Sequence, residues 1–202
     1  NADVYCRYFS KISTKSVITN PMLKKRINEA ASNAMKKVKE IIGMLEEGKS
    51  LALVTDAGTP GISDPGGMLI SQIMSPSSQE GVGGVAKVIP IPGSCAAIAA
   101  LSISGFPTDK FVFMGFPPHK NKRQKYFKEV AGTEYTVVFY ESGHRILKCL
   151  QELKVLLTPD RQLVVCRELT KKFETIYRGN IDQIVEEMKD ERGEFVVIIS
   201  NY

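Results

Sequence analysis

Residues 51–67 (LALVTDAGTPGISDPGG) constrain the fold of this chain more than any other stretch. The apolar run 51–54 is typical of a strand that is buried on both faces. The following residues are mostly Gly, Pro, Asp, Thr and Ser, which the interior of a helix or strand tolerates poorly, because Pro lacks a donor and Gly costs backbone entropy. Residues 68–74 then become apolar again with helical spacing. We therefore expect a buried strand, a rigid glycine-lined loop and a helix, in that order.

A loop of this kind favours a ligand-binding function. In open α/β sheets, ligands bind beyond the carboxyl ends of the strands. The glycines let a ligand approach the bare backbone, while Asp56 and Thr59 supply polar groups. The alternative is an ordinary strand-to-helix turn, but the repeated Asp with Gly and Pro favours a ligand loop.

A second unit of the same kind follows further along the chain. Residues 87–92 (KVIPIP) predict another buried strand, which runs into Gly93, Ser94, Cys95 and Ala96 and then into a small-residue helix over residues 97–104. Small side chains at such a turn let backbone amides approach a polar ligand. They are equally consistent with tight packing of a helix on a sheet, and this segment alone does not decide between the two.

The remaining pattern predicts two α/β domains. Residues 28–47 have helical periodicity with Gly48 as a C-cap, and residues 2–6 and 17–18 predict short strands. The segment 105–109 (GFPTD) breaks the pattern, so we place the boundary between domains 1–108 and 109–202. The second half predicts strands at 111–116, 135–140, 163–166, 175–179 and 195–200, and helices at 126–131, 144–156 and after Asn180 or Asp182. We expect a mainly parallel sheet in the first domain and a mixed sheet in the second.

Composition narrows the class of protein. Among 202 residues, 43% are hydrophobic and 24% charged, which is typical of a soluble globular protein. No apolar run of about 18 residues predicts a membrane span, and no signal peptide is visible, so we expect a cytoplasmic protein. The four cysteines (6, 95, 149 and 166) lack metal-site spacing, and we expect reduced, mostly buried thiols and no metal. The net charge of +5 hints at a polyanionic partner.

Several motifs occur in an order that identifies a family. VTDAGTPGISDPG, IPGSCAAIAALSISGFPTDKF, FYESGHR, CRELTKKFE and GEFVVII together resemble the ribosomal RNA small subunit methyltransferase I family, over about residues 28–200. That family belongs to the tetrapyrrole-methylase-like superfamily of S-adenosylmethionine (SAM) enzymes. The resemblance implies the two-domain fold of that superfamily with SAM between the domains, a homodimer, and methylation of a cytidine ribose 2′-hydroxyl in the decoding region of 16S rRNA.

The resemblance also implies a set of cofactor-binding residues. In the first loop these are Gly58, Thr59, Pro60 and Ile62; in the second loop Gly93, Cys95 and Ala96; and in the second domain Tyr140 and Glu141. Exposed amides can bind the polar edges of SAM, and Ile62 can cover an apolar face.

Catalysis and RNA binding suggest further residues. A ribose hydroxyl is a weak nucleophile, so a general base should help, and Asp56 and Glu141 are the leading candidates, with Glu168 a third. Each has a structural alternative: Asp56 can cap its loop, and Glu168 can pair with Arg167.

The basic segment 119–125 predicts phosphate contacts. We expect the RNA surface to contain Lys120, Lys122, Arg123, Arg145, Arg167 and Lys171.

The sequence departs from the family pattern in two places. Family members have a first strand followed by a Pro/Gly loop, which does not occur here, and Ser94 and Cys95 stand where the family usually has Pro and Ser. Two rival functions follow. One is a tetrapyrrole or diphthine methyltransferase of the same fold, against which the basic loop and CRELTKKFE argue. The other is a non-catalytic RNA-binding assembly factor.

Overall fold

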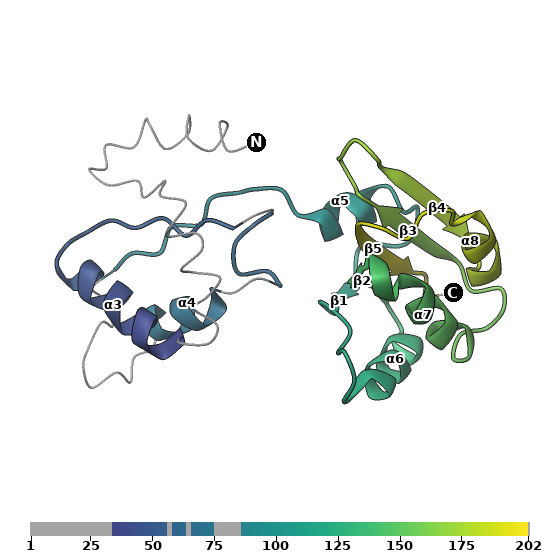
Figure 1. Ribbon diagram of the computed structural model, residues 1–202, viewed down its shortest axis with the longest axis horizontal. Helices are drawn as coiled ribbons and strands as arrows, with labels where there is room; N and C mark the ends of the chain where they lie inside the picture. The colour runs from purple at the N-terminus through teal and green to yellow at the C-terminus, as the bar shows by residue number, and fades with distance from the viewer. Residues whose placement is uncertain (1–33, 56–57, 64–65, 75–85, 202) are drawn as a thin grey trace. The chain divides into compact units, whose positions relative to one another are not determined.

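The computed structural model describes residues 34–55, 58–63, 66–74 and 86–201 (Figure 1). The described residues fall into two compact units, divided between Gly93 and Ser94. The expected strands at residues 2–6 and 17–18 lie outside the described residues, as do Cys6, Asp56 and the start of the predicted helix 28–47.

Two helices are described in the N-terminal unit, and they pack on each other (Figure 1). Helix α3 spans Ala34–Glu46 and helix α4 spans Gly67–Met74, which confirms the predicted helix at 68–74. After α3, Gly48 adopts a φ of 77°. The Gly48 N–H donates to the Leu45 carbonyl, and the Lys49 N–H donates to the Met44 carbonyl. This is the Schellman arrangement, so the prediction of Gly48 as the C-cap is confirmed.

The two runs expected to be buried strands in this unit are not strands in the structure. Residues 51–54 and 87–92 have no strand pairing among the described residues, and Val54 and Ile89 are 56% and 64% exposed. The prediction of buried strands here is therefore wrong. Apolar sequence makes a strand favourable only where neighbouring strands accept its backbone hydrogen bonds, and no described residues of this unit do so.

A five-stranded mixed sheet forms the centre of the C-terminal unit (Figure 1). Its strands are β1 (Phe111–Phe113), β2 (Thr136–Ser142), β3 (Leu163–Arg167), β4 (Thr175–Gly179) and β5 (Glu194–Ile199), in the spatial order β1-β2-β5-β3-β4. β1 and β2 are parallel, while β2–β5, β5–β3 and β3–β4 are antiparallel pairs. The predicted mixed sheet is confirmed.

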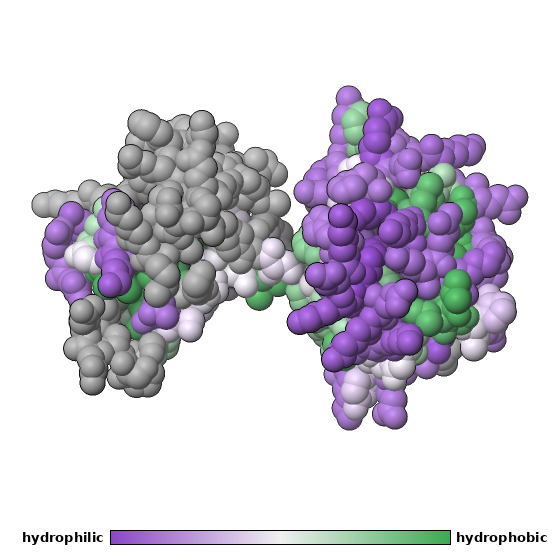
Figure 2. Space-filling view, turned by 60° about the horizontal axis from the view of Figure 1, so that its bottom comes forward, coloured by the Kyte–Doolittle hydropathy of each residue, from purple (hydrophilic) through white to green (hydrophobic). Residues whose placement is uncertain are grey.

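Successive side chains along the buried strands point to opposite faces of the sheet, so both faces carry apolar residues. Helices cover each of these faces. On one face lie α6 (Arg123–Gly132), α7 (Gly143–Lys154) and α8 (Ile181–Glu187), which share a core with Phe139, Val165 and Val197. On the other face lies α5 (Ala96–Ser102), which packs through Ala97, Ala100 and Leu101 against Val138, Val164, Val196 and Ile198. In the view of Figure 2, most of the surface of this unit is hydrophilic, with apolar residues gathered in patches.

Hydrogen bonds from side chains stabilise the ends of two helices of this unit. Asn180, one of the two predicted caps, forms a capping box with Gln183 at the start of α8. At the end of α5, the Arg178 guanidinium from β4 donates to the carbonyls of Ile103 (2.5 Å) and Ser104 (3.0 Å). Within the described residues, no helix is long and apolar enough to cross a membrane.

Candidate functional site

The strand directions bring several of the sequence-predicted residues to one edge of the sheet. β1, β2 and β3 all run the same way, because β2 and β3 are each antiparallel to β5. Their carboxyl ends therefore meet at one edge, which we call the carboxyl edge. The segments after these strands (114–122, 142–143 and 168–174) and the segment 188–193 before β5 all lie there. In sheets with parallel strands this is where ligands bind.

Tyr140 is positioned on the face of the sheet that α5 covers. Its hydroxyl accepts a hydrogen bond from the Ala97 N–H at 3.2 Å and lies 3.9 Å from the Cys95 sulfur. Its ring packs edge-on against Phe113, with centroids 5.1 Å apart, and in a tilted arrangement against Phe116, with centroids 5.3 Å apart. The structure therefore brings together Tyr140 and Cys95, which the sequence predicted for one ligand site from segments 45 residues apart. Ala96 is exposed beside them.

Glu141 faces away from Tyr140, as strand alternation requires. Its side chain is fully buried and pairs with two arginines, at 3.4 Å from Arg123 and 2.8 Å from Arg145. It also accepts the N–H of Ser142 at 2.8 Å. A buried carboxylate with two cationic partners is a structural ion pair, and removal of one partner leaves an uncompensated charge. The structure does not bring Glu141 together with Cys95 and Tyr140.

Arg123 and Arg145 are held by the protein around Glu141. Arg123 is 4% exposed, and it donates to Glu152 at 2.7 Å and to the Pro118 carbonyl at 3.2 Å. Arg145 donates to Ser142 Oγ at 2.9 Å and to the Pro117 carbonyl at 3.4 Å. These contacts fix the segment after β1 to the start of α7. Both guanidinium groups are thus occupied by protein acceptors.

Arg167, at the end of β3, joins two loops of the carboxyl edge. Its guanidinium donates to the carbonyls of Arg192 (2.7 Å) and Phe173 (2.9 Å) and to the Asp190 carboxylate (2.8 Å). Its side chain is only 10% exposed. The sequence alternative that Arg167 pairs with Glu168 is therefore wrong, because Arg167 points toward the 190–192 segment and Asp190 is its carboxylate partner.

Glu168 pairs instead with Lys171. The Lys171 ammonium lies 2.9 Å from Glu168 and 2.8 Å from Glu194, and Glu168 also accepts the N–H of Glu194 at 2.9 Å. The hydrogen bond from Lys171 lowers the pKa of Glu168, and the hydrogen bond to Glu194 raises the pKa of Lys171. Glu168 and Thr170 have left-handed backbones, with φ of 49° and 63°, which are uncommon for residues with side chains.

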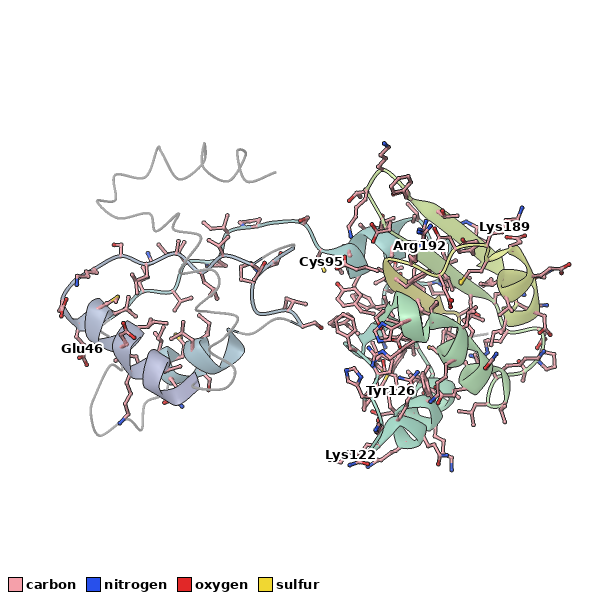
Figure 3. The ribbon with its side chains drawn as sticks, viewed as in Figure 1. Glu46, Cys95, Lys122, Tyr126, Lys189 and Arg192 are labelled. Carbon is pink, nitrogen blue, oxygen red and sulfur yellow. The ribbon has the colours of Figure 1, made fainter. Side chains whose placement is uncertain are left out.

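The basic segment after β1 contains two exposed cations of this edge. Lys120 and Lys122 are exposed, and Lys122 precedes α6 with a φ of 67° (Figure 3). Lys171 keeps 46% of its side chain exposed despite its two carboxylate partners. Of the six cations predicted to bind RNA, the three lysines are thus accessible, whereas Arg123, Arg145 and Arg167 are largely buried.

In the N-terminal unit, the predicted ligand loop has the backbone expected of a glycine loop. Gly58 and Gly61 have φ of 75° and 85°, and Thr55 Oγ1 donates to the Gly58 carbonyl at 3.2 Å. A Cβ at Gly66 would meet the Leu53 side chain at 2.9 Å. Thr59 and Pro60 are half-buried and Ile62 is 48% exposed, while Gly93 ends this unit. Among the described residues, no group of His, Cys, Asp and Glu could hold a metal ion.

Comparison with known families decides the identity of this fold. The family model described as tetrapyrrole (corrin/porphyrin) methylases matches residues 5–185. The chain belongs to the tetrapyrrole methylase family. The expectation of the α/β fold of this superfamily is thereby confirmed.

Curated relatives within the tetrapyrrole methylases are more specific. The chain is 43% identical to the ribosomal RNA small subunit methyltransferase I of Vibrio cholerae, over 84% of this chain and 58% of that protein. It is 38% identical to the protein of the same name from a Synechocystis species, over 96% of this chain and 66% of that protein. The chain thus spans about three fifths of the length of the relatives it matches.

Solved tetrapyrrole methylases have the same fold. The crystal structure of the methyltransferase CobJ matches with a TM-score of 0.60 and 22% identity, over 81% of this chain and 70% of that one. A Thermus thermophilus uroporphyrin-III C-methyltransferase, complexed with S-adenyl homocysteine, matches with a TM-score of 0.52 and 16% identity, over 80% and 72% of the two chains.

Sequence reasoning missed several residues of the carboxyl edge. Phe173, Asp190 and Arg192 were not predicted, although Phe173 lies within the CRELTKKFE motif. Phe173 could have been recognised as a candidate from the sequence, because it is a large apolar residue among charged residues in a segment too short for a helix. No local signal marks Asp190 and Arg192, because their partner Arg167 lies more than 20 residues earlier.

Proposed function

We propose that this protein is a SAM-dependent methyltransferase that acts on the ribose 2′-hydroxyl of a cytidine in the decoding region of 16S rRNA. The observation that carries the proposal is the 43% identity to the Vibrio cholerae ribosomal RNA small subunit methyltransferase I. The motif resemblance implies the 2′-hydroxyl of a cytidine as the methyl acceptor. No motif of the chain requires a metal.

The residues around Tyr140 fit one wall of a SAM site. The small side chains of Cys95 and Ala96 leave backbone accessible beside an aromatic cluster, and Phe116 there is 50% exposed. Adenosine needs an apolar surface together with a few polar atoms. The related Thermus methyltransferase with bound S-adenyl homocysteine supports this class of ligand. We assign Gly58, Thr59, Pro60, Ile62 and Gly93 to the same cofactor.

Methyl transfer from a sulfonium to a hydroxyl is an in-line displacement, so the protein contributes mainly by positioning the hydroxyl and accepting its proton. SAM, when bound, supplies the electrophilic methyl group. Asp56 is our candidate for the base. Because Glu141 is buried between Arg123 and Arg145, we assign it the role of positioning the segment after β1 and the start of α7.

For RNA, Lys120, Lys122 and Lys171 are the proposed phosphate contacts, since exposed cations release counterions from RNA. The three arginines predicted with them bind protein groups rather than RNA, and they hold in place the loops that carry these lysines. We further propose a homodimer in the cytoplasm, where ribosomal subunits are substrates. Light scattering of the purified full-length protein tests the dimer.

The decisive experiment measures transfer of a tritiated methyl group from SAM to small ribosomal subunits from a strain that lacks the enzyme. We expect label in the ribose of one rRNA cytidine. Asp56→Asn should lower the single-turnover rate by about 100-fold or more, with SAM affinity by calorimetry unchanged. A rate equal to that of the wild type would remove Asp56 as the base.

The same measurements separate the rival functions. A protein that binds SAM but transfers no methyl group to RNA fits a tetrapyrrole or diphthine methyltransferase. A protein that binds RNA but neither SAM nor S-adenyl homocysteine fits an assembly factor. As a control, Tyr135→Leu changes an exposed aromatic residue beside β2 and should leave both SAM binding and transfer unchanged.

A further inference from the structure

An open hollow lies at the carboxyl edge between the β3–β4 loop and the segment before β5. It has a volume of about 360 Å³ and is lined by Arg167, Glu168, Phe173, Asp190, Arg192 and Gly193. The residues assigned above to SAM are not among them. The hollow is therefore a separate feature of this unit, and the proposed reaction does not use it.

Phe173 forms the aromatic wall of the hollow. Its side chain is 62% exposed, which is costly for a phenylalanine in water. The Lys172 ammonium lies 5.5 Å from its ring centroid, and the Phe173 carbonyl accepts a hydrogen bond from Arg167 at 2.9 Å. The β3–β4 loop thus holds an exposed ring on a fixed backbone.

Arg192 forms a second wall (Figure 3). Its side chain is 86% exposed, but Asp190 binds it in a bidentate manner, with distances of 2.9 and 3.0 Å. A guanidinium held edge-on by a carboxylate keeps its flat faces free for stacking. The Arg192 carbonyl accepts from Arg167 at 2.7 Å, so one buried guanidinium holds the backbone of both walls.

The charges of the hollow select the chemistry of its ligand. Its lining contains two arginines and two carboxylates, and Arg167 and Arg192 both bond to Asp190. A phosphate would meet guanidinium groups whose charge is already balanced, together with two repelling carboxylates. A flat, neutral group with a π face meets no such penalty and can stack on Phe173.

We infer that this hollow is a docking subsite for one unpaired nucleobase of the RNA, stacked on Phe173 with Arg192 as the second wall. The inference rests on the proposed RNA substrate. It adds a recognition element distinct from the phosphate-binding lysines. Stacking on an aromatic side chain tolerates any base, so the subsite contributes affinity and register and does not read sequence.

The test compares Phe173→Leu, Phe173→Tyr and the wild-type full-length protein in binding to small ribosomal subunits and to an in vitro transcript of the decoding region, without SAM. Phe173→Leu should weaken binding to both probes by about tenfold, and Phe173→Tyr should restore affinity to within about twofold. The salt dependence of the affinity should keep its slope, because no charge is changed.

Tyr135→Leu is the matched control, because Tyr135 is also exposed (41%) with a lysine, Lys110, over its ring, but precedes β2 at the opposite edge of the sheet. Its RNA affinity should equal that of the wild type. Wild-type affinity for Phe173→Leu, or no binding of either probe by the wild type, would overturn the subsite. A loss confined to whole subunits would point to a ribosomal protein contact and also overturn it. Absent methyl transfer with an intact Phe173 effect would instead reject only the proposed activity.

Discussion

Adjacent residues of β2 have different roles because their side chains enter opposite faces of the sheet. Tyr140 lies with α5 and Cys95, whereas Glu141 is buried with Arg123 and Arg145. A family motif that contains both residues therefore joins a proposed ligand wall to an internal ion pair. Conversely, a residue with no functional group can be as constrained as either, and Gly143 is the example in the same motif.

Gly143→Ala should destabilise the protein by about 3 kcal/mol. Gly143 begins α7, its N–H donates to the Gly193 carbonyl at 2.9 Å, and an added Cβ would overlap the Glu191 carbonyl oxygen. Since these neighbours are backbone atoms, they cannot rotate away. Urea unfolding measures the effect. Gly132→Ala is the control, because a Cβ there meets no atom within 4 Å, and it should leave stability unchanged or slightly higher.

At the scale of elements, the carboxyl edge is held by ion pairs between loops. Arg167 at the end of β3 pairs with Asp190 in the segment before β5, and Lys171 of the β3–β4 loop pairs with Glu168 and with Glu194 at the start of β5. Hydrogen bonds from Arg192 lower the pKa of Asp190, and those from Lys171 lower the pKa of Glu168. Both carboxylates are thus more acidic in the folded protein than their ordinary values of 3.8 and 4.5.

These shifts predict a loss of stability in acid. A carboxylate whose pKa is lowered by folding contributes its full stabilisation when the pH is above its ordinary pKa. This contribution is lost as the pH falls through the pKa of the folded state. At pH values below about 4.5 the melting temperature should therefore decrease. The decrease should be smaller for Glu168→Gln than for the wild type. Melting curves between pH 6 and 3 provide the measurement. Glu186→Gln, which removes an exposed carboxylate of α8, should follow the wild-type profile, and an identical profile for Glu168→Gln would contradict the assignment.

For the whole molecule, the effect of the excess positive charge depends on which basic side chains are exposed. The net charge is +5, but buried ion pairs occupy Arg123, Arg145 and Arg167, so we expect the exposed lysines to supply the proposed attraction to RNA. Charge that is already paired inside the protein releases few counterions from RNA. Counting basic residues in the sequence therefore overestimates the number of cations available to the proposed RNA partner.

Neutralising Lys120 and Lys122 together should make the salt dependence of RNA affinity shallower by about two in the slope of log K against log salt. The change from Lys to Gln removes two exposed charges and leaves the Arg123 ion pairs intact. Filter binding at several salt concentrations measures the slope. Lys110→Gln with Lys128→Gln removes the same charge from two exposed residues outside this segment. An equal change in both double variants would mean that net charge, rather than this loop, sets the slope.

Sequence periodicity predicted the C-terminal unit well, because its strands and helices have local signals. The capping box at Asn180 and the apolar run of β2 are examples. It failed for residues 51–54 and 87–92, where hydrophobicity alone does not supply a pairing partner. Site residues were predicted by motif, so Cys95 and Tyr140 were found together. The ion-pair partners of Arg123 and Arg167 lie 18 to 29 residues away, and spacing alone cannot reveal them.

The position of β5 has a consequence for how the protein is made. β5 is the last of the five strands along the chain, yet it lies between β2 and β3 and bonds to both. Until the ribosome releases residues 194–199, β2 and β3 each have an open edge lined by apolar residues. Their pairing spans long stretches of chain and is slow to form. We therefore expect a late, aggregation-prone state during synthesis of this unit, in which a chaperone bound to these edges would protect the nascent chain until β5 inserts.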